Sequence, residues 1–187
     1  MKQPTMFASS SRRAVWVICA ALCLSSSAVL AEGFASLVRV QDQRVDFSSL
    51  PLNNAIKTVQ GNGARKLAVF ADPYCPFCRK LEQTLSEVKN VTIYTFLFPI
   101  LTPKSRPMSE ALWCAPDADA AWRAWMLEAR PPAQTASCTH SPIASNLALA
   151  MGLGVHVTPT VVFSDGELMT GALPLDDLNS ILDSKPR

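Results

Sequence analysis

The chain has 187 residues, of which 49% are hydrophobic, and its 17 Lys and Arg side chains face 15 Asp and Glu. This length and composition suit one globular domain with a sizeable core. The charges nearly balance and no basic cluster occurs, so nothing favours a nucleic-acid partner.

Residues 1–31 have the pattern of a secretory signal peptide. A basic start is followed by an apolar run over residues 14–24, and Val29 and Ala31 are the small residues expected before a cleavage site. We expect cleavage after about Ala31 and export to the periplasm. The apolar run is too short to span a bilayer, so no stable membrane insertion is expected.

Cleavage would leave 156 residues with 14 basic and 15 acidic side chains. Four cysteines remain, Cys75, Cys78, Cys114 and Cys138, an even number in an exported chain. Disulfide chemistry is therefore the first expectation, with no metal and no cofactor other than the redox pair itself.

Residues 32–65 are expected to form a short N-terminal segment with a linker helix. The helix is predicted between Leu50 and Val59, because apolar residues recur there at helical spacing and Gly61 to Gly63 follow. The apolar positions are Leu52, Ala55, Ile56 and Val59.

The main domain is expected over residues 66–187 and begins with a buried strand at 66–71. A helix follows over 75–89, and residues 91–98 are rich in β-branched and aromatic residues, as in a second strand. This order predicts a βαβ unit whose two strands are parallel.

Residues 105–151 read as a mostly helical insertion interrupted by proline-containing loops. Strands at 160–163 and 168–170 flank the turn Asp165-Gly166, which predicts a hairpin. An amphipathic helix over 175–182 completes the domain.

The stretch FADPYCPFCRK places two cysteines at the junction of the first strand and its helix. Backbone N–H groups at a helix N-terminus stabilise a thiolate, which is the nucleophile in thiol–disulfide exchange. We therefore predict that Cys75 attacks and that Cys78, one turn further on, resolves the mixed disulfide. A local structural disulfide and a four-cysteine zinc site are the alternatives.

Cys114 and Cys138 bracket the central helix of the insertion and fit a structural disulfide. Such a bond would close a loop of 25 residues, which a chain-entropy argument values at roughly 3 kcal/mol. A second pair that shuttles electrons is the alternative.

Several segments occur in the order seen in the catalytic domains of the periplasmic DsbC/DsbG disulfide isomerases. They are VFADPYCPFCRKLE, VTIYTFLFPIL, ALWCAPDADAAWRAWM, the later Cys138, NLALAMGLGVHVTPTVVFSDGELMTG and LPLDDL. From about Leu50 to Leu182 the chain resembles this family. The resemblance implies an α/β, thioredoxin-like fold, in which helices flank a central mixed sheet, with a helical insertion.

The resemblance also implies roles for individual residues. Thr158 and Pro159 match the threonine and cis-proline that face the redox cysteines and bind an extended substrate segment. Cys75 and Cys78 match the redox pair, and Cys114 and Cys138 match the family's structural disulfide. Beside the redox pair, the aromatic residues Tyr74 and Phe77 are expected to grip apolar substrate segments.

The implied function is that of an isomerase or reductase acting on exported proteins with disulfides, kept reduced by a membrane electron donor. The family carries an N-terminal dimerisation domain, and the 34 residues from Glu32 to Arg65 leave room only for a remnant. Isomerase activity gains from that domain, so oligomeric state and direction of exchange stay open. The alternatives are a dithiol oxidase and a non-enzymatic thiol-based holdase or Cu(I) carrier.

Overall fold

The computed structural model describes residues 44–132 and 138–187, which belong to one compact unit spanning Gln43–Arg187. The expected signal peptide and its cleavage site lie outside the described residues. Among the helices in the described ranges, none is both long and apolar enough to cross a membrane.

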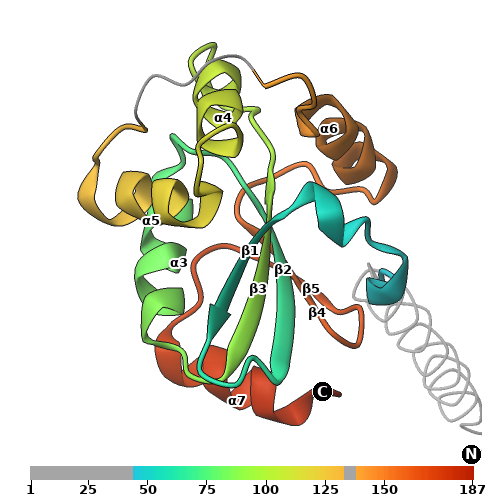
Figure 1. The fold of residues 1–187 in the computed structure, drawn as a ribbon. Helices are drawn as coiled ribbons and strands as arrows, with labels where there is room; N and C mark the ends of the chain where they lie inside the picture. Colours follow the sequence, from blue (N-terminus) through green and yellow to red (C-terminus); the bar gives the residue numbers. More distant parts are fainter. Residues whose placement is uncertain (1–43, 133–137) are drawn as a thin grey trace, which may run out of the picture. The chain divides into compact units, whose positions relative to one another are not determined.

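A five-stranded mixed sheet forms the centre of the unit (Figure 1). Its spatial order is β1-β3-β2-β4-β5, and the strands are β1 (Ile56–Gln60), β2 (Arg65–Ala71), β3 (Val91–Leu97), β4 (Thr160–Phe163) and β5 (Leu168–Thr170). β2 and β3 are parallel, with Leu67 opposite Ile93, and the other three pairings are antiparallel. The expected βαβ unit and hairpin are confirmed.

Helices cover both faces of the sheet. They are α3 (Pro76–Glu87), α4 (Ser105–Trp113), α5 (Ala118–Glu128), α6 (Ile143–Gly152) and α7 (Leu175–Ser184), preceded by the 3-10 turns η1 (Phe47–Ser49) and η2 (Leu52–Asn54). The three helices α4, α5 and α6 come between β3 and β4 in the chain, within the region read as mostly helical.

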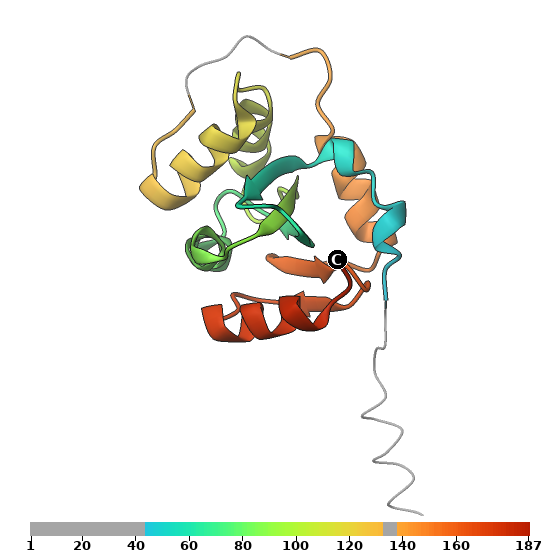
Figure 2. The same cartoon turned by 60° about the horizontal axis from the view of Figure 1, so that its bottom comes forward.

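Successive side chains of the central strands enter two separate apolar clusters. One cluster contains residues of α3, α5 and α7 and, from the sheet, Leu67, Val69, Ile93, Val161 and Phe163. The other contains residues of α6 and the N-terminal segment and, from the sheet, Ala68, Phe70, Phe96 and Val162. Figure 2 shows α3 and α6 on opposite sides of the strands. Burial on both faces explains why β2 is a continuous apolar run.

The predicted linker helix is wrong. Residues 52–54 form the single 3-10 turn η2, and the chain continues as β1, antiparallel to β3. Ile56 and Thr58 are buried, whereas Lys57 is exposed and Val59 is 54% exposed, so side chains alternate as in an edge strand. The helical spacing of apolar residues was misleading because Val59 does not enter the core.

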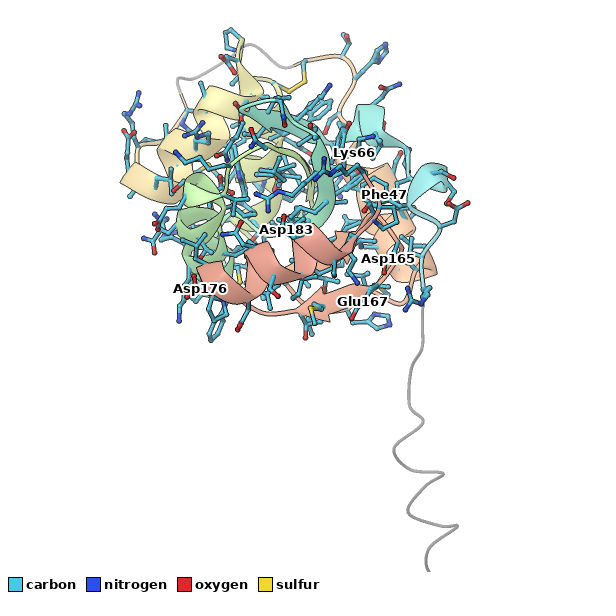
Figure 3. All side chains as sticks on the ribbon, turned by 90° about the horizontal axis from the view of Figure 1, so that it is seen from below. Phe47, Lys66, Asp165, Glu167, Asp176 and Asp183 are labelled. Atoms are coloured by element: carbon cyan, nitrogen blue, oxygen red, sulfur yellow. A yellow bond between two sulfur atoms is a disulfide. The ribbon has the colours of Figure 1, made fainter. Side chains whose placement is uncertain are left out.

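The end of the sheet opposite the cysteine pair carries a small ionic cluster. Figure 3 views the molecule from below, with Asp165 and Glu167 labelled on the turn between β4 and β5. Lys185 forms ion pairs with both carboxylates. Burial alone would raise the pKa of Asp165, but the hydrogen bond from Lys185 and other donors lowers it to about 2.

Candidate active site

Cys75 and Cys78 lie where β2 ends and α3 begins. Cys75 is the N-cap residue, with extended backbone angles, and Pro76 occupies the first helical turn, where a missing N–H costs nothing. Both cysteines are free thiols, and only 3% of Cys75 and 2% of Cys78 is exposed. The two thiols that a disulfide at this position would join therefore lie within one helical turn of each other.

The Cys75 sulfur has two polar contacts. The backbone N–H of Cys78 donates to Cys75 Sγ at 3.4 Å, and the thiol donates to the carbonyl oxygen of Thr158 at 3.3 Å. The N–H contact is the stabilisation of a sulfur at a helix N-terminus that the sequence suggested. The carbonyl contact brings together residues 83 positions apart.

The loop before β4 forms the wall opposite the cysteines. The Thr158–Pro159 peptide bond is cis, and Pro159 is buried. This loop faces Cys75 through the Thr158 carbonyl, so the residues implied by the family resemblance lie at the thiol pair.

The surroundings of Cys78 favour the protonated thiol. Burial strongly raises its pKa, and the neighbouring Cys75 adds to the effect, while the Asp72 backbone and the Thr158 side chain oppose it. A thiol of this kind is a weak nucleophile until it is deprotonated. A raised pKa is what the predicted resolving role of Cys78 calls for, because that thiol must stay protonated until the mixed disulfide has formed.

Asp72 anchors the cysteine loop, a role that the sequence analysis missed. Its fully buried carboxylate accepts hydrogen bonds from the N–H groups of Tyr74, Ile100 and Leu101 and from the Ser105 hydroxyl, at 2.8–2.9 Å. These bonds join the end of β2 to the segment between β3 and α4. An aspartate directly after a buried strand was the available signal, but three of its four partners lie 28–33 residues away.

Four apolar side chains on segments near the site are exposed. Phe77 is 61% exposed, Ile100 39%, Leu101 49% and Val157 52%. The backbone of Ile100 and Leu101 is hydrogen-bonded to Asp72, three residues before Cys75, and Val157 precedes Thr158, whose carbonyl contacts Cys75. Three segments close to the cysteine pair therefore carry exposed apolar side chains. Of the four, only Phe77 was singled out from the sequence.

Tyr74 has a different position from Phe77. It is partly buried, and its ring contacts Trp125 edge-on, with centroids 5.5 Å apart. It also lines an apolar pocket of about 430 Å³ with residues of α4 and with Pro131 and Pro132.

Cys114 and Cys138 are joined by a disulfide, with Cα atoms 5.5 Å apart. The bond connects the end of α4 to the segment before α6 and so encloses α5. Within the described part of the chain, no group of three or more His, Cys, Asp or Glu side chains has a metal-binding arrangement.

Comparisons with known proteins agree with this architecture. The family model described as a thioredoxin-like domain matches residues 52–185. A crystal structure of a disulfide interchange protein from Neisseria gonorrhoeae has a TM-score of 0.69 and 39% sequence identity, over 72% of this chain and 96% of that one. The chain therefore belongs to the thioredoxin-like family, and the predicted fold class is confirmed.

Curated relatives show which proteins within the thioredoxin-like family this chain resembles. A probable thiol:disulfide interchange protein DsbC of Bordetella parapertussis is 45% identical over 139 residues, which are 74% of this chain and 49% of the relative. The Escherichia coli DsbC is 33% identical over 121 residues, 63% of this chain and 50% of the relative. The expected resemblance to DsbC is confirmed, and the chain spans about half the length of these relatives.

Proposed function

We propose that this chain exchanges disulfides with exported proteins in the periplasm, as an isomerase or reductase, using Cys75 as attacking thiolate and Cys78 as resolving thiol. One observation carries the proposal. The Cys75 sulfur lies at the start of α3, receives the Cys78 N–H, and faces the cis-proline loop. Relatives named for thiol:disulfide interchange support the same chemistry.

The exchange begins when the Cys75 thiolate attacks one sulfur of a client disulfide. The client S–S bond breaks, a mixed disulfide forms at Cys75, and the departing client thiolate takes up a proton. In the reductase branch, Cys78 loses its proton and attacks Cys75 Sγ, which releases the second client thiol. The client gains two electrons, and the Cys75–Cys78 pair becomes a disulfide.

In the isomerase branch, another client thiolate attacks the mixed disulfide before Cys78 does. Cys75 returns as a thiolate, and the client has changed its pairing without net oxidation or reduction. The raised pKa of Cys78 favours this branch, because slow deprotonation of the resolving thiol lengthens the life of the mixed disulfide.

The surface that binds a client protein is expected to include the exposed apolar side chains near the cysteine pair. An extended client segment would lie along the backbone beside Thr158 and Pro159, with apolar side chains against Phe77, Ile100 and Leu101. Unfolded or mispaired proteins expose such segments. A membrane protein that donates electrons by thiol–disulfide exchange would return the cysteine pair to its reduced form after each reductase turnover.

Two assays test the proposal together. The reduced protein should restore activity to a scrambled multi-disulfide substrate and should reduce insulin, and Cys75→Ser should abolish both. Cys78→Ser is the matched control, because it should still form a mixed disulfide with the substrate but release it slowly. A Cys75→Ser variant as active as the parent would refute the proposal.

Redox equilibration with glutathione shows whether the cysteine pair tends to reduce client disulfides or to form them. A pair that stays reduced over the thiol-rich range supports an isomerase or reductase, whereas a strongly oxidising pair would assign the chain as a dithiol oxidase. Insulin reduction without rescue of the scrambled substrate would leave the reductase and remove the isomerase.

A further inference from the structure

Helix α5 holds the loop that carries Cys75. Trp125 Nε1 donates a hydrogen bond of 2.7 Å to the carbonyl oxygen of Pro73, two residues before Cys75. The same indole contacts the ring of Tyr74, the residue between them. The cysteine loop therefore has a polar and an aromatic contact with one side chain of α5.

Arg79 ties the first turns of α3 to the same point on α5. Its Nη1 donates to the carbonyl oxygens of Trp125 at 3.2 Å and Met126 at 2.7 Å, and its guanidinium lies 5.9 Å from the Trp125 ring centroid. The Trp125 carbonyl also accepts the N–H of Ala129 at 3.1 Å, and a cation is favoured at the C-terminal end of a helix. Arg79 is therefore held by specific protein partners, unlike a surface charge that contacts only water.

These contacts come from a segment closed by the second disulfide. Cys114 lies directly after α4 and Cys138 lies beyond α5, so the bond encloses the whole of that helix. A further buried contact, from Trp122 Nε1 to Glu82 of α3 at 2.9 Å, fastens α5 in the same orientation. The disulfide therefore restricts the element that supports the redox site.

We propose that Arg79 and Trp125 are positioning residues for Cys75, and that the Cys114–Cys138 disulfide sets how firmly they hold it. The proposal rests on the proposed function, because positioning is measured through the reaction of Cys75. It gives the second disulfide an effect on the first site in addition to its effect on stability.

Loss of one contact should lower the share of molecules in which Cys75 is presented at the start of α3. One net hydrogen bond supports an effect of about three- to tenfold on the rate of attack. Trp125→Phe keeps an aromatic ring beside Tyr74 and removes the N–H bond together with part of the ring that faces Arg79. Arg79→Ala removes both carbonyl bonds, and Arg79→Lys retains the charge and should recover part of the loss.

The measurement is the second-order rate of mixed-disulfide formation between the full chain and a peptide disulfide, made in a Cys78→Ser background so that the product accumulates. Lys80→Ala is the matched control, since it removes a neighbouring positive charge that is exposed. We expect Trp125→Phe and Arg79→Ala to slow the reaction about three- to tenfold and Lys80→Ala to leave it unchanged. Thermal unfolding of each variant checks that the fold is retained.

A double-mutant cycle tests the coupling to the disulfide. In a Cys114→Ser, Cys138→Ser background, the effect of Trp125→Phe should shrink to less than about twofold, because the helix that carries the indole is already loosened. Equal effects of Trp125→Phe in both backgrounds would overturn the coupling. Variants of Trp125 and Arg79 that react as fast as the parent would overturn the positioning role, whereas a parent without reaction at Cys75 would refute the proposed function instead.

Discussion

Asp72→Asn tests whether one buried carboxylate fixes the cysteine loop. The carboxylate accepts four hydrogen bonds, two on each oxygen. An amide keeps one acceptor oxygen and replaces the other with a donor. If the oxygen faces Ile100 and Leu101, the amide N–H₂ faces the N–H of Tyr74, and only the Ser105 hydroxyl can turn to accept. One backbone donor is then unpaired and two charged bonds become neutral, a total cost of about 3 kcal/mol.

The assay is urea unfolding of both proteins at neutral pH, with the midpoint and slope fitted separately. Asp46→Asn is the matched control, because Asp46 also accepts two hydrogen bonds, both from Ser48, but at an exposed N-cap. Asparagine caps a helix about as well as aspartate, so this change should leave the urea midpoint close to that of the parent.

A result for Asp72→Asn within about 0.5 kcal/mol of the parent, at an unchanged slope, would refute the reasoning. It would mean that water or a shifted loop satisfies the same donors without cost. The rate of mixed-disulfide formation at Cys75 in this variant gives an independent readout, and it should fall together with the stability.

Three further predictions follow from the geometry. Burial raises the pKa of Glu82 despite the hydrogen bond from Trp122, so the folded form binds a proton more tightly than the unfolded form, and stability should decline as pH rises from about 4.5 through the folded pKa. Glu82→Gln should remove this decline in unfolding measurements, and a parallel decline in the variant would contradict the assignment. Replacing Cys114 and Cys138 with serine should reduce the free energy of unfolding by about 3 kcal/mol, and a loss below about 1 kcal/mol would show that the closed loop restricts little. Because burial raises the pKa of Cys78, its alkylation in a variant without the other redox thiol should still accelerate above about pH 9, where an ordinary thiol with a pKa near 8.5 levels off, and a plateau at or below about pH 9 would argue against a raised pKa.

Local patterns in the sequence determined most of the sheet and its helices. The continuous apolar run of β2, the β-branched run of β3 and the Asp165-Gly166 turn each identify an element without reference to a partner. The start of α3 could also be predicted, because Pro76 and the apolar stripe that follows Cys78 both indicate a helix.

Tertiary structure decided the segment before β2. Between Leu52 and Val59 the apolar residues fit a helix as well as an edge strand, and the sequence alone favoured the helix. Pairing with β3 supplies the backbone hydrogen bonds that make β1 a strand, and those partners are 31–39 residues away. A local pattern carries no information about such a partner.

The same distinction applies to the site. The proposal that Cys75 and Cys78 form the redox pair could be made from the sequence, because both residues and the helix that presents them lie within one short stretch. The supports of that pair were not evident: Asp72 binds a segment 28 residues away, and Trp125 binds Pro73 across 52 residues. A polar group in a folded chain takes whichever partner packing brings to it, so only the assembled structure shows what holds the reactive sulfur in place.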